Sequence, residues 1–263
     1  MLDVAQEERF LAISVVIMAY NEVHTLASTV SEILSVLDAV VFNESVLPLI
    51  SESADSVKLA DISSFGSECA YEILIIDDGS TDGTGALADD LAQTYASIRV
   101  LHHPTNLGLG EAYRTGFRYA RGEYLTFFPA DGQYAADIIR QFLPLMDEVD
   151  MILGYLPENR RTLLTRVLST LERLLYRLVI GPLPRFQSIM MFKRSLLDAI
   201  PLYCTGRGWG IVMEFVIKVS RGGYKVRSVP TNVRPRLSGT SKVNNWRTIW
   251  ANFSQVLSLR RYL

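Results

Sequence analysis

Short apolar runs rich in β-branched and aromatic residues recur along the first 155 residues, and segments with helical spacing separate them. Runs of this kind, bounded by turn residues, predict buried strands. Strands that alternate with helices predict an α/β fold with a mostly parallel sheet and helices on both faces. The predicted strands are 13–19, 71–77, 97–102, 123–128 and 150–154; the predicted helices are 22–37, one that follows the turn 77–84 and ends near 95, 108–120 and 135–147.

The regular alternation of predicted strands and helices ends after Gly154. We expect further strands at 188–192 and 224–230, a helix at 211–221, and two amphipathic helices, one within 160–185 and one from 244 to about 260. Residues 38–70 lose all periodicity and are rich in Ser, Asp and Glu, so we interpret them as a flexible acidic insertion. The chain is predicted to form one domain over residues 1–263.

The net charge of −2 conceals an asymmetry along the chain. Residues 1–150 hold 7 Lys and Arg against 24 Asp and Glu, whereas residues 151–263 hold 19 against 4. Such opposed halves indicate that the second half faces an anionic partner, or that the halves neutralise each other across a shared surface. The composition, with 49% hydrophobic residues, excludes wholesale disorder.

The cysteines and histidines predict no metal centre of the zinc type. Cys69 and Cys204 lack any Cys-x-x-Cys or Cys/His spacing, which is typical of a reducing compartment. His102 and His103 are adjacent, so on a strand they point to opposite faces and are poor partners for one metal. The acidic start has no apolar core of a signal peptide, and no run is long enough to cross a membrane, so we expect a cytoplasmic protein.

Short polar residues follow three predicted strands. Strand 13–19 leads into Tyr20-Asn21-Glu22, strand 71–77 ends in Asp77-Asp78, and strand 123–128 leads into Asp131 and Gln133. The carboxyl ends of parallel strands meet at one edge of a sheet, where ligands bind. Such residues also occur simply as turn and capping residues, but acids at two strand ends favour a cation or nucleotide site.

Two common phosphate-binding patterns are excluded. Gly108 and Gly110 begin a dinucleotide-like pattern, but Tyr113 stands where that pattern needs its third glycine. No Gly-x-x-x-x-Gly-Lys-Ser/Thr loop is present either.

Five stretches in order resemble family 2 glycosyltransferases of the GT-A fold, and are most similar to polyprenyl-phosphate sugar transferases. They cover most of the chain outside 38–70. The stretches are AYNE, DDGSTDGT, NLGLGEAYRTGFRYARGEYLTFFPADGQ, Glu214 ahead of GGYKVRSVP, and Arg236-x-x-Gly239-x-Ser241-Lys242.

The resemblance implies a role for each matching residue. Tyr20, Asn21, Glu22 and Gly108 would belong to the nucleotide site, with Asp77 and Asp78 beside the base and ribose. Asp131 matches the last acid of the family's DxD motif, and Gln133 matches a following ligand of Mg²⁺ or Mn²⁺. Arg236, Ser241 and Lys242 match residues that close over the diphosphate. The chain departs from the family at Pro129, where the first acid of the motif is expected.

The acceptor is inferred from charge. A phosphate monoester has a second pKa near 6, so it is already a nucleophile at neutral pH, whereas a hydroxyl needs a base. Arg160 and Arg161, which lie at the start of the arginine-rich segment 160–185, are our candidates for the acceptor phosphate.

We therefore expect an inverting, metal-dependent transferase that moves a sugar from a nucleotide diphosphate to a polyprenyl phosphate. It would lie peripherally at the cytosolic face of a membrane and bind no nucleic acid. One alternative is transfer to a hydroxyl of a glycan or lipid, with Glu214 as base. Another is a non-catalytic protein that binds nucleotide sugars.

Segment 160–185 predicts binding to anionic lipid, because six arginines accompany one leucine stripe. The chain should sediment with anionic but not with neutral liposomes, and added salt should release it. Changing Arg166, Arg173 and Arg177 together to Gln should weaken binding by roughly 3 kcal/mol at most, at about 1 kcal/mol for each charge. Equal sedimentation with both kinds of liposome would contradict an electrostatic interface.

Overall fold

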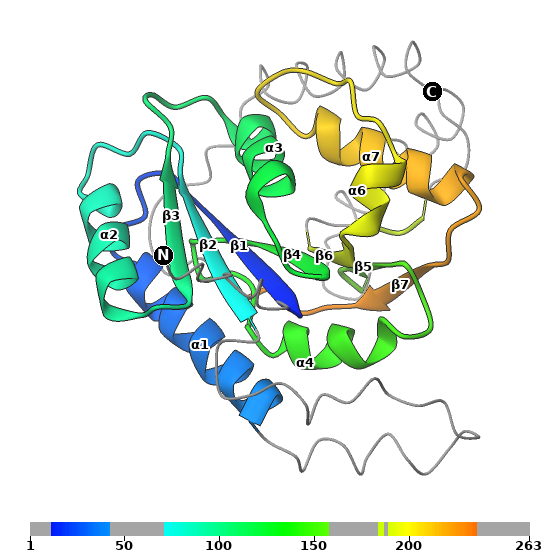
Figure 1. The fold of residues 1–263 in the computed structure, drawn as a ribbon, viewed down its shortest axis with the longest axis horizontal. Helices are drawn as coiled ribbons and strands as arrows, with labels where there is room; N and C mark the ends of the chain where they lie inside the picture. The colour runs from blue at the N-terminus through cyan, green and yellow to red at the C-terminus, as the bar shows by residue number, and fades with distance from the viewer. Residues whose placement is uncertain (1–11, 43–70, 158–183, 187–188, 236–263) are drawn as a thin grey trace, which may run out of the picture.

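The computed structural model describes residues 12–42, 71–157, 184–186 and 189–235. Within these residues, seven strands form one sheet in the order β3-β2-β1-β4-β6-β5-β7 (Figure 1). The strands are β1 (Ile13–Ala19), β2 (Tyr71–Asp77), β3 (Ile98–His102), β4 (Tyr124–Pro129), β5 (Met151–Tyr155), β6 (Met190–Lys193) and β7 (Val226–Pro230). The helices are α1 (Leu26–Phe42), α2 (Thr84–Thr94), α3 (Leu109–Tyr119), α4 (Ile138–Phe142), the 3₁₀ helix η3 (Leu143–Leu145), α6 (Ser195–Ala199) and α7 (Gly210–Arg221).

The sheet is mostly parallel, as the alternation of strands and helices predicts. β1 pairs in parallel with β2 on one side and with β4 on the other, and β3 pairs in parallel with the outer side of β2. β6 is antiparallel to both of its neighbours, β4 and β5, and β7 again runs parallel to β5. Six of the seven described strands therefore point their carboxyl ends at one edge of the sheet.

Two apolar cores lie on opposite faces of this sheet. On one face, alternate residues such as Val15 and Ile73 pack with α1, α2 and α4. On the other, their neighbours Val16 and Leu74 pack with α3, α6 and α7. Figure 1 shows the same division of the helices between the two faces. Burial on both faces explains why β1 and β2 are continuous apolar runs and do not alternate with polar residues.

The predicted boundaries of two helices are wrong, and the first of these helices, expected from residue 22, begins at Leu26. α1 continues to Phe42, so residues 38–42 do not belong to the insertion expected at 38–70. The apolar face of α1 continues that far, because Val36, Leu37 and Val40 all pack into the core. The helix expected at 135–147 is instead the short α4 followed by η3, which contains a proline at its start, where a missing N–H interrupts α-helical hydrogen bonding.

Several expectations lie outside the described residues: the remainder of the insertion (43–70), most of the amphipathic segment 160–185 and the helix from 244 to about 260. Within the part of the chain that is described, no helix is both long and apolar enough to cross a bilayer.

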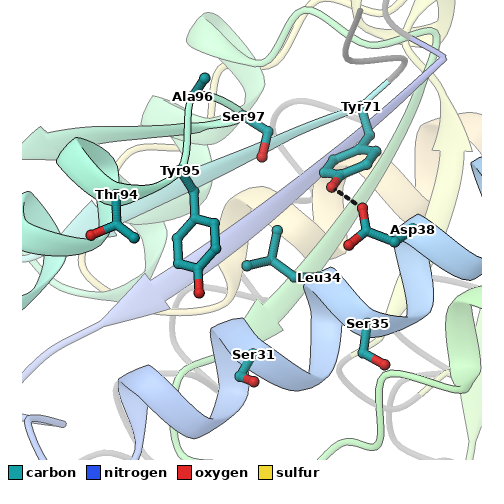
Figure 2. Close-up of a pocket in the computed structure, with 9 residues that line it drawn as sticks. All are labelled: Ser31, Leu34, Ser35, Asp38, Tyr71, Thr94, Tyr95, Ala96 and Ser97. Carbon is teal, nitrogen blue, oxygen red and sulfur yellow. Dashed lines mark hydrogen bonds between the residues drawn. The ribbon is translucent and has the colours of Figure 1, made fainter. Parts of the chain in front are cut away.

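A hollow of about 600 Å³ lies between α1 and the turn that joins α2 to β3. Figure 2 shows its lining, in which the Tyr71 hydroxyl donates a hydrogen bond to the Asp38 carboxylate. Tyr71 is the first residue of β2, and Ser97 directly precedes β3. The hollow is therefore at the amino ends of the strands, opposite the edge where ligands of parallel α/β sheets bind.

Candidate active site

The ends of β2, β1 and β4 are level with one another. Ala19 pairs with Asp77 on one side of β1, and Met18 pairs with Pro129 on the other. Backbone hydrogen bonds continue past the strand ends, from the Asp78 N–H to the Ala19 carbonyl at 2.9 Å and from the Ala130 N–H to the Met18 carbonyl at 3.0 Å. The three turns that follow are thereby brought together at one edge, as the sequence predicts. They contain Tyr20, Asn21 and Glu22, then Asp78, and then Asp131.

The turn after β1 is joined to the turn after β2 by hydrogen bonds. The Asn21 N–H donates to Ser80 Oγ at 3.0 Å, and the Thr81 N–H donates to Asn21 Oδ1 at 2.8 Å. The Glu22 N–H donates to Thr84 Oγ1 at 2.9 Å. Asn21 has φ 54°, a left-handed conformation that asparagine tolerates better than most residues. The two predicted nucleotide loops therefore form a single surface.

The Asp77 carboxylate is buried and held on two sides. The Ser80 N–H donates to Oδ1 at 3.0 Å, and the His102 ring meets Oδ2 through Nδ1 at 2.9 Å. Burial by itself would raise the pKa of Asp77, but the hydrogen bonds from Ser80 and His102 outweigh it, and the pKa is lowered. Asp77 is therefore a carboxylate at neutral pH and a hydrogen-bond acceptor.

Asp78 organises the loop that follows β3. Its carboxylate accepts hydrogen bonds from the backbone N–H groups of Leu107 and Gly108, both at 2.9 Å, from Asn106 Nδ2 at 2.9 Å and from His103 Nδ1 at 2.7 Å. The structure therefore brings together Gly108 and Asp78, two of the residues predicted for the nucleotide site. The arrangement also makes Asp78 the residue that shapes this loop.

Gly108 is required by its surroundings. It has φ 93°, and a Cβ there would lie 2.8 Å from the Arg207 carbonyl oxygen. The Arg207 guanidinium in turn donates a hydrogen bond to Asn106 Oδ1. The loop before α7 thus packs directly on the loop before α3, and any side chain at position 108 would push them apart.

Asp131 and Gln133 lie together in the turn after β4. Asp131 is buried and its Oδ1 accepts the Gln133 N–H at 3.1 Å, across Gly132 with φ 69°. A carboxylate and an amide supply hard oxygen ligands, which suit Mg²⁺ or Mn²⁺. The described residues contain no cluster of three His, Cys, Asp or Glu that could hold a metal alone. The donor set therefore fits a cation that takes its remaining ligands from phosphate oxygens and water.

The segment that precedes Arg236 is anchored beside this turn. The Arg234 N–H donates to the Gln133 carbonyl at 2.8 Å, and Tyr134 forms an antiparallel bridge with Val233. The Arg234 guanidinium makes two hydrogen bonds to Glu32 of α1, at 2.8 and 3.0 Å. The chain thus leaves the described region next to Gln133, two residues before Arg236. Arg236, Ser241, Lys242, Arg160 and Arg161 themselves lie outside the described residues.

Glu214 is wholly buried in α7 and is surrounded by hydrogen-bond donors. Its carboxylate accepts the Tyr203 N–H at 3.0 Å, the Cys204 N–H at 2.6 Å and Lys218 Nζ at 2.7 Å. These contacts attach the loop before α7 to the helix, and the same loop carries Arg207 to Gly108. In this position Glu214 fixes the loop beside the strand ends.

The sequence does not reveal the roles of the two histidines. His102 is the last residue of β3 and His103 follows it, and each contacts one of the candidate acids: His102 meets Asp77, and His103 meets Asp78. The register of β2 with β3, in which Asp77 pairs with His102, produces this match. Parallel pairing between segments 25 residues apart leaves no local signal in the sequence.

Residues 14–201 match the family model described as Glycosyl transferase family 2. The chain belongs to glycosyl transferase family 2. Two relatives agree with this membership. This family 2 chain is 32% identical, over 187 residues, to polyprenol monophosphomannose synthase of Mycolicibacterium smegmatis, an alignment that covers 65% of the chain and 70% of the relative. It is 29% identical, over 93% of its length, to glycosyltransferase AglD of Haloferax volcanii, but it spans only 36% of that relative.

Solved structures share the fold of this family 2 chain. Glucosyl-3-phosphoglycerate synthase of Mycobacterium tuberculosis, in a complex with Mn²⁺, UDP-glucose and phosphoglyceric acid, matches with a TM-score of 0.63 at 19% identity, over 95% of this chain and 80% of that one. The mannosyltransferase PcManGT of Pyrobaculum calidifontis, in a complex with GDP-mannose and Mn²⁺, matches with a TM-score of 0.53 at 18% identity, over 84% of this chain and 55% of that one. The fold is therefore GT-A.

Because the Glu214 carboxylate accepts several buried hydrogen bonds, we expect its substitution to lower the stability of the fold. Glu214→Gln keeps one acceptor oxygen but turns an NH₂ group toward buried donors, and should lower the free energy of unfolding by about 1–3 kcal/mol. Urea denaturation measures this change. The exposed Asp198→Asn is the control and should leave stability unchanged. Full stability with complete loss of transfer would instead identify Glu214 as the general base.

Proposed function

We propose that the chain is an inverting transferase that moves one sugar from a nucleoside diphosphate to a polyprenyl phosphate. The observation that carries this proposal is the level alignment of β2, β1 and β4, which brings Asp77, Asp78 and Asp131 to one edge in a family 2 chain. The relative from Mycolicibacterium smegmatis, a polyprenol monophosphomannose synthase, supports the choice of acceptor. Membrane contact through segment 160–185, at the cytosolic face, is part of the same proposal.

The sugar donor would contact the turns that follow β1 and its two neighbours in the sheet, β2 and β4. The nucleoside would lie against Tyr20–Glu22, Asp77 and Asp78, and its diphosphate would extend toward Asp131. Carboxylates near the base and ribose accept hydrogen bonds from N–H and hydroxyl groups, which the buried, ionised Asp77 can do. Asp131 and Gln133 would hold Mg²⁺ or Mn²⁺, which neutralises charge on the diphosphate when bound.

The reaction itself would need no general base. An oxygen of the acceptor phosphate attacks the anomeric carbon of the sugar, and the bond from that carbon to the diphosphate oxygen breaks. The nucleoside diphosphate leaves with the bonding electron pair, and the configuration at the anomeric carbon inverts. Arg236, Ser241 and Lys242 would bind the leaving diphosphate, while Arg160 and Arg161 would hold the acceptor phosphate.

The hydrogen bonding of Glu214 favours a phosphate acceptor over a hydroxyl. A base must reach the proton that it removes, but this carboxylate is wholly buried and accepts two backbone N–H groups and Lys218. A phosphate monoester, which is already anionic, avoids this requirement.

Acceptor specificity tests the proposal directly. The chain is incubated with Mn²⁺, either UDP-glucose or GDP-mannose, and either a polyprenyl phosphate or the matched polyprenol in detergent. A lipid-linked sugar should form with the phosphate and not with the polyprenol. Transfer to the polyprenol would support the hydroxyl-acceptor alternative. Binding of a nucleotide sugar without transfer to any acceptor would support the non-catalytic alternative.

Asp131→Asn should abolish transfer and leave the fold intact. The amide keeps an oxygen for the Gln133 N–H but loses the charge of the one DxD-motif carboxylate that remains, because Pro129 replaces the other. Transfer rates at a fixed Mn²⁺ concentration, together with thermal denaturation, measure both effects. The control is Asp137→Asn, an exposed acid of the same segment. Retained activity in Asp131→Asn would move the metal site elsewhere.

Arg236→Ala and Lys242→Ala should each lower kcat more than they raise the KM of the sugar donor. Charge on the diphosphate grows as its bond to the sugar breaks, so a hydrogen-bond donor that follows this charge contributes most in the transition state. Steady-state kinetics separate the two constants. Lys225→Ala, an exposed lysine before β7, is the control. A change confined to KM would mean that these residues bind ground state and transition state equally.

A further inference from the structure

The His102 ring joins two carboxylates from different elements. Its Nδ1 lies 2.9 Å from Asp77 Oδ2 at the end of β2, and its Nε2 lies 3.1 Å from Asp89 Oδ1 on α2. An ionised carboxylate only accepts hydrogen bonds, and an imidazole has two N–H donors only when it is protonated. Both contacts can therefore form at once only with a positively charged His102.

The local backbone leaves space for this arrangement. A Cβ at Gly85, in the first turn of α2, would lie 2.7 Å from Asp77 Oδ2 and 3.5 Å from the His102 ring. Any side chain at position 85 would displace the Asp77 carboxylate from His102. With Ser80 on its other oxygen, Asp77 is restricted to a single orientation.

Asp77 and Asp89 are the hydrogen-bond partners of His102, and the other charged side chains nearby have partners elsewhere. From α3, residues Glu111, Arg114, Arg118 and Tyr119 line a hollow of about 330 Å³ together with His102 and His103. Glu111 pairs with Arg114, and Arg118 lies over the Tyr119 ring. His103 has partners of its own, Asp78 and Thr115.

The hydrogen bond with Asp77 raises the pKa of His102 above 6.5, with a further contribution from Asp89, and burial opposes them only partly. A raised pKa means that the His102 contacts stabilise the fold fully below pH 6.5. That stabilisation is lost as pH rises through the raised value. The positive charge on His102 is therefore retained above pH 6.5 and lost only as pH passes its raised pKa.

We propose that His102 is a positioning residue for the nucleotide: it orients the Asp77 carboxylate, and its positive charge offsets that of Asp77 beside an anionic sugar donor. This inference rests on the proposed function. When His102 loses its proton, the Nδ1–H can still be donated to Asp77, but the offsetting charge is gone. Nucleotide affinity should therefore fall by about fivefold as the ring titrates, which is the effect expected of one nearby charge in a partly solvated site.

Calorimetric titration of the full chain with UDP and with GDP, in Mn²⁺ from pH 6 to 8.5, tests the proposal. Kd for the bound nucleotide should rise about fivefold across the titration of His102 in the wild-type chain. His102→Asn, whose amide NH₂ occupies the position of Nδ1, should bind at all pH values as the wild type does at high pH. His102→Leu should bind more weakly than both throughout.

Two further variants distinguish positioning from general structure. Asp89→Asn removes the outer charge and should shift the profile to lower pH without loss of affinity at low pH. His24→Asn changes an exposed histidine and should leave the profile unchanged. The chain has three histidines, so NMR can follow each Cε1–Hε1 group through a pH titration. The titration midpoint of His102 should lie above pH 6.5 in the wild type and at a lower pH in Asp89→Asn.

The outcomes separate this inference from the proposed function. A wild-type chain that binds neither UDP nor GDP at any pH overturns the proposed function, and the role of His102 falls with it. Tight wild-type binding that is unchanged in a folded His102→Leu variant overturns the role of His102 alone. A His102 midpoint at or below 6.5 does the same.

Discussion

The Asp78 carboxylate is buried at the end of β2, and a buried charge is tolerated only where hydrogen-bond donors surround it. The loop 106–108 supplies three of these donors and His103 a fourth. This requirement fixes the path of the chain from β3 into α3. It also determines the position of Gly108, against which the loop carrying Arg207 packs. Glu214 in turn fixes that second loop to α7, because its carboxylate accepts the N–H groups of Tyr203 and Cys204.

The two halves of the chain would contribute different chemistry to the candidate site. The acidic first half supplies Asp77, Asp78 and Asp131 at level strand ends, which suits a nucleoside and a cation. A diphosphate also needs positive charge, and the basic second half carries Arg236 and Lys242. The contact between the Arg234 N–H and the Gln133 carbonyl brings the start of that basic segment to the acidic turn. The near-neutral total charge is therefore consistent with both halves meeting at one site.

Pro129 changes how that site can hold a cation. With one carboxylate and one amide from the described turn, the protein supplies few ligands, and phosphate oxygens of the nucleotide would have to supply others. Metal and nucleotide would then bind together and depend on each other. The buried Asp131 accepts the Gln133 N–H across the left-handed Gly132, so the backbone of this turn is held in one shape.

The sequence by itself determined the strands, the parallel sheet and the edge at which Asp77, Asp78 and Asp131 meet. Those features follow from local periodicity and from the rule that parallel strands end together. It did not determine that α1 reaches Phe42, because the apolar stripe continues into a stretch of otherwise polar composition. Nor did it predict the pairing of His102 with Asp77, of Arg234 with Glu32, or of Glu214 with the backbone of Tyr203 and Cys204. Only the tertiary structure decided these contacts, because each joins separate elements whose mutual positions depend on packing over the whole sheet.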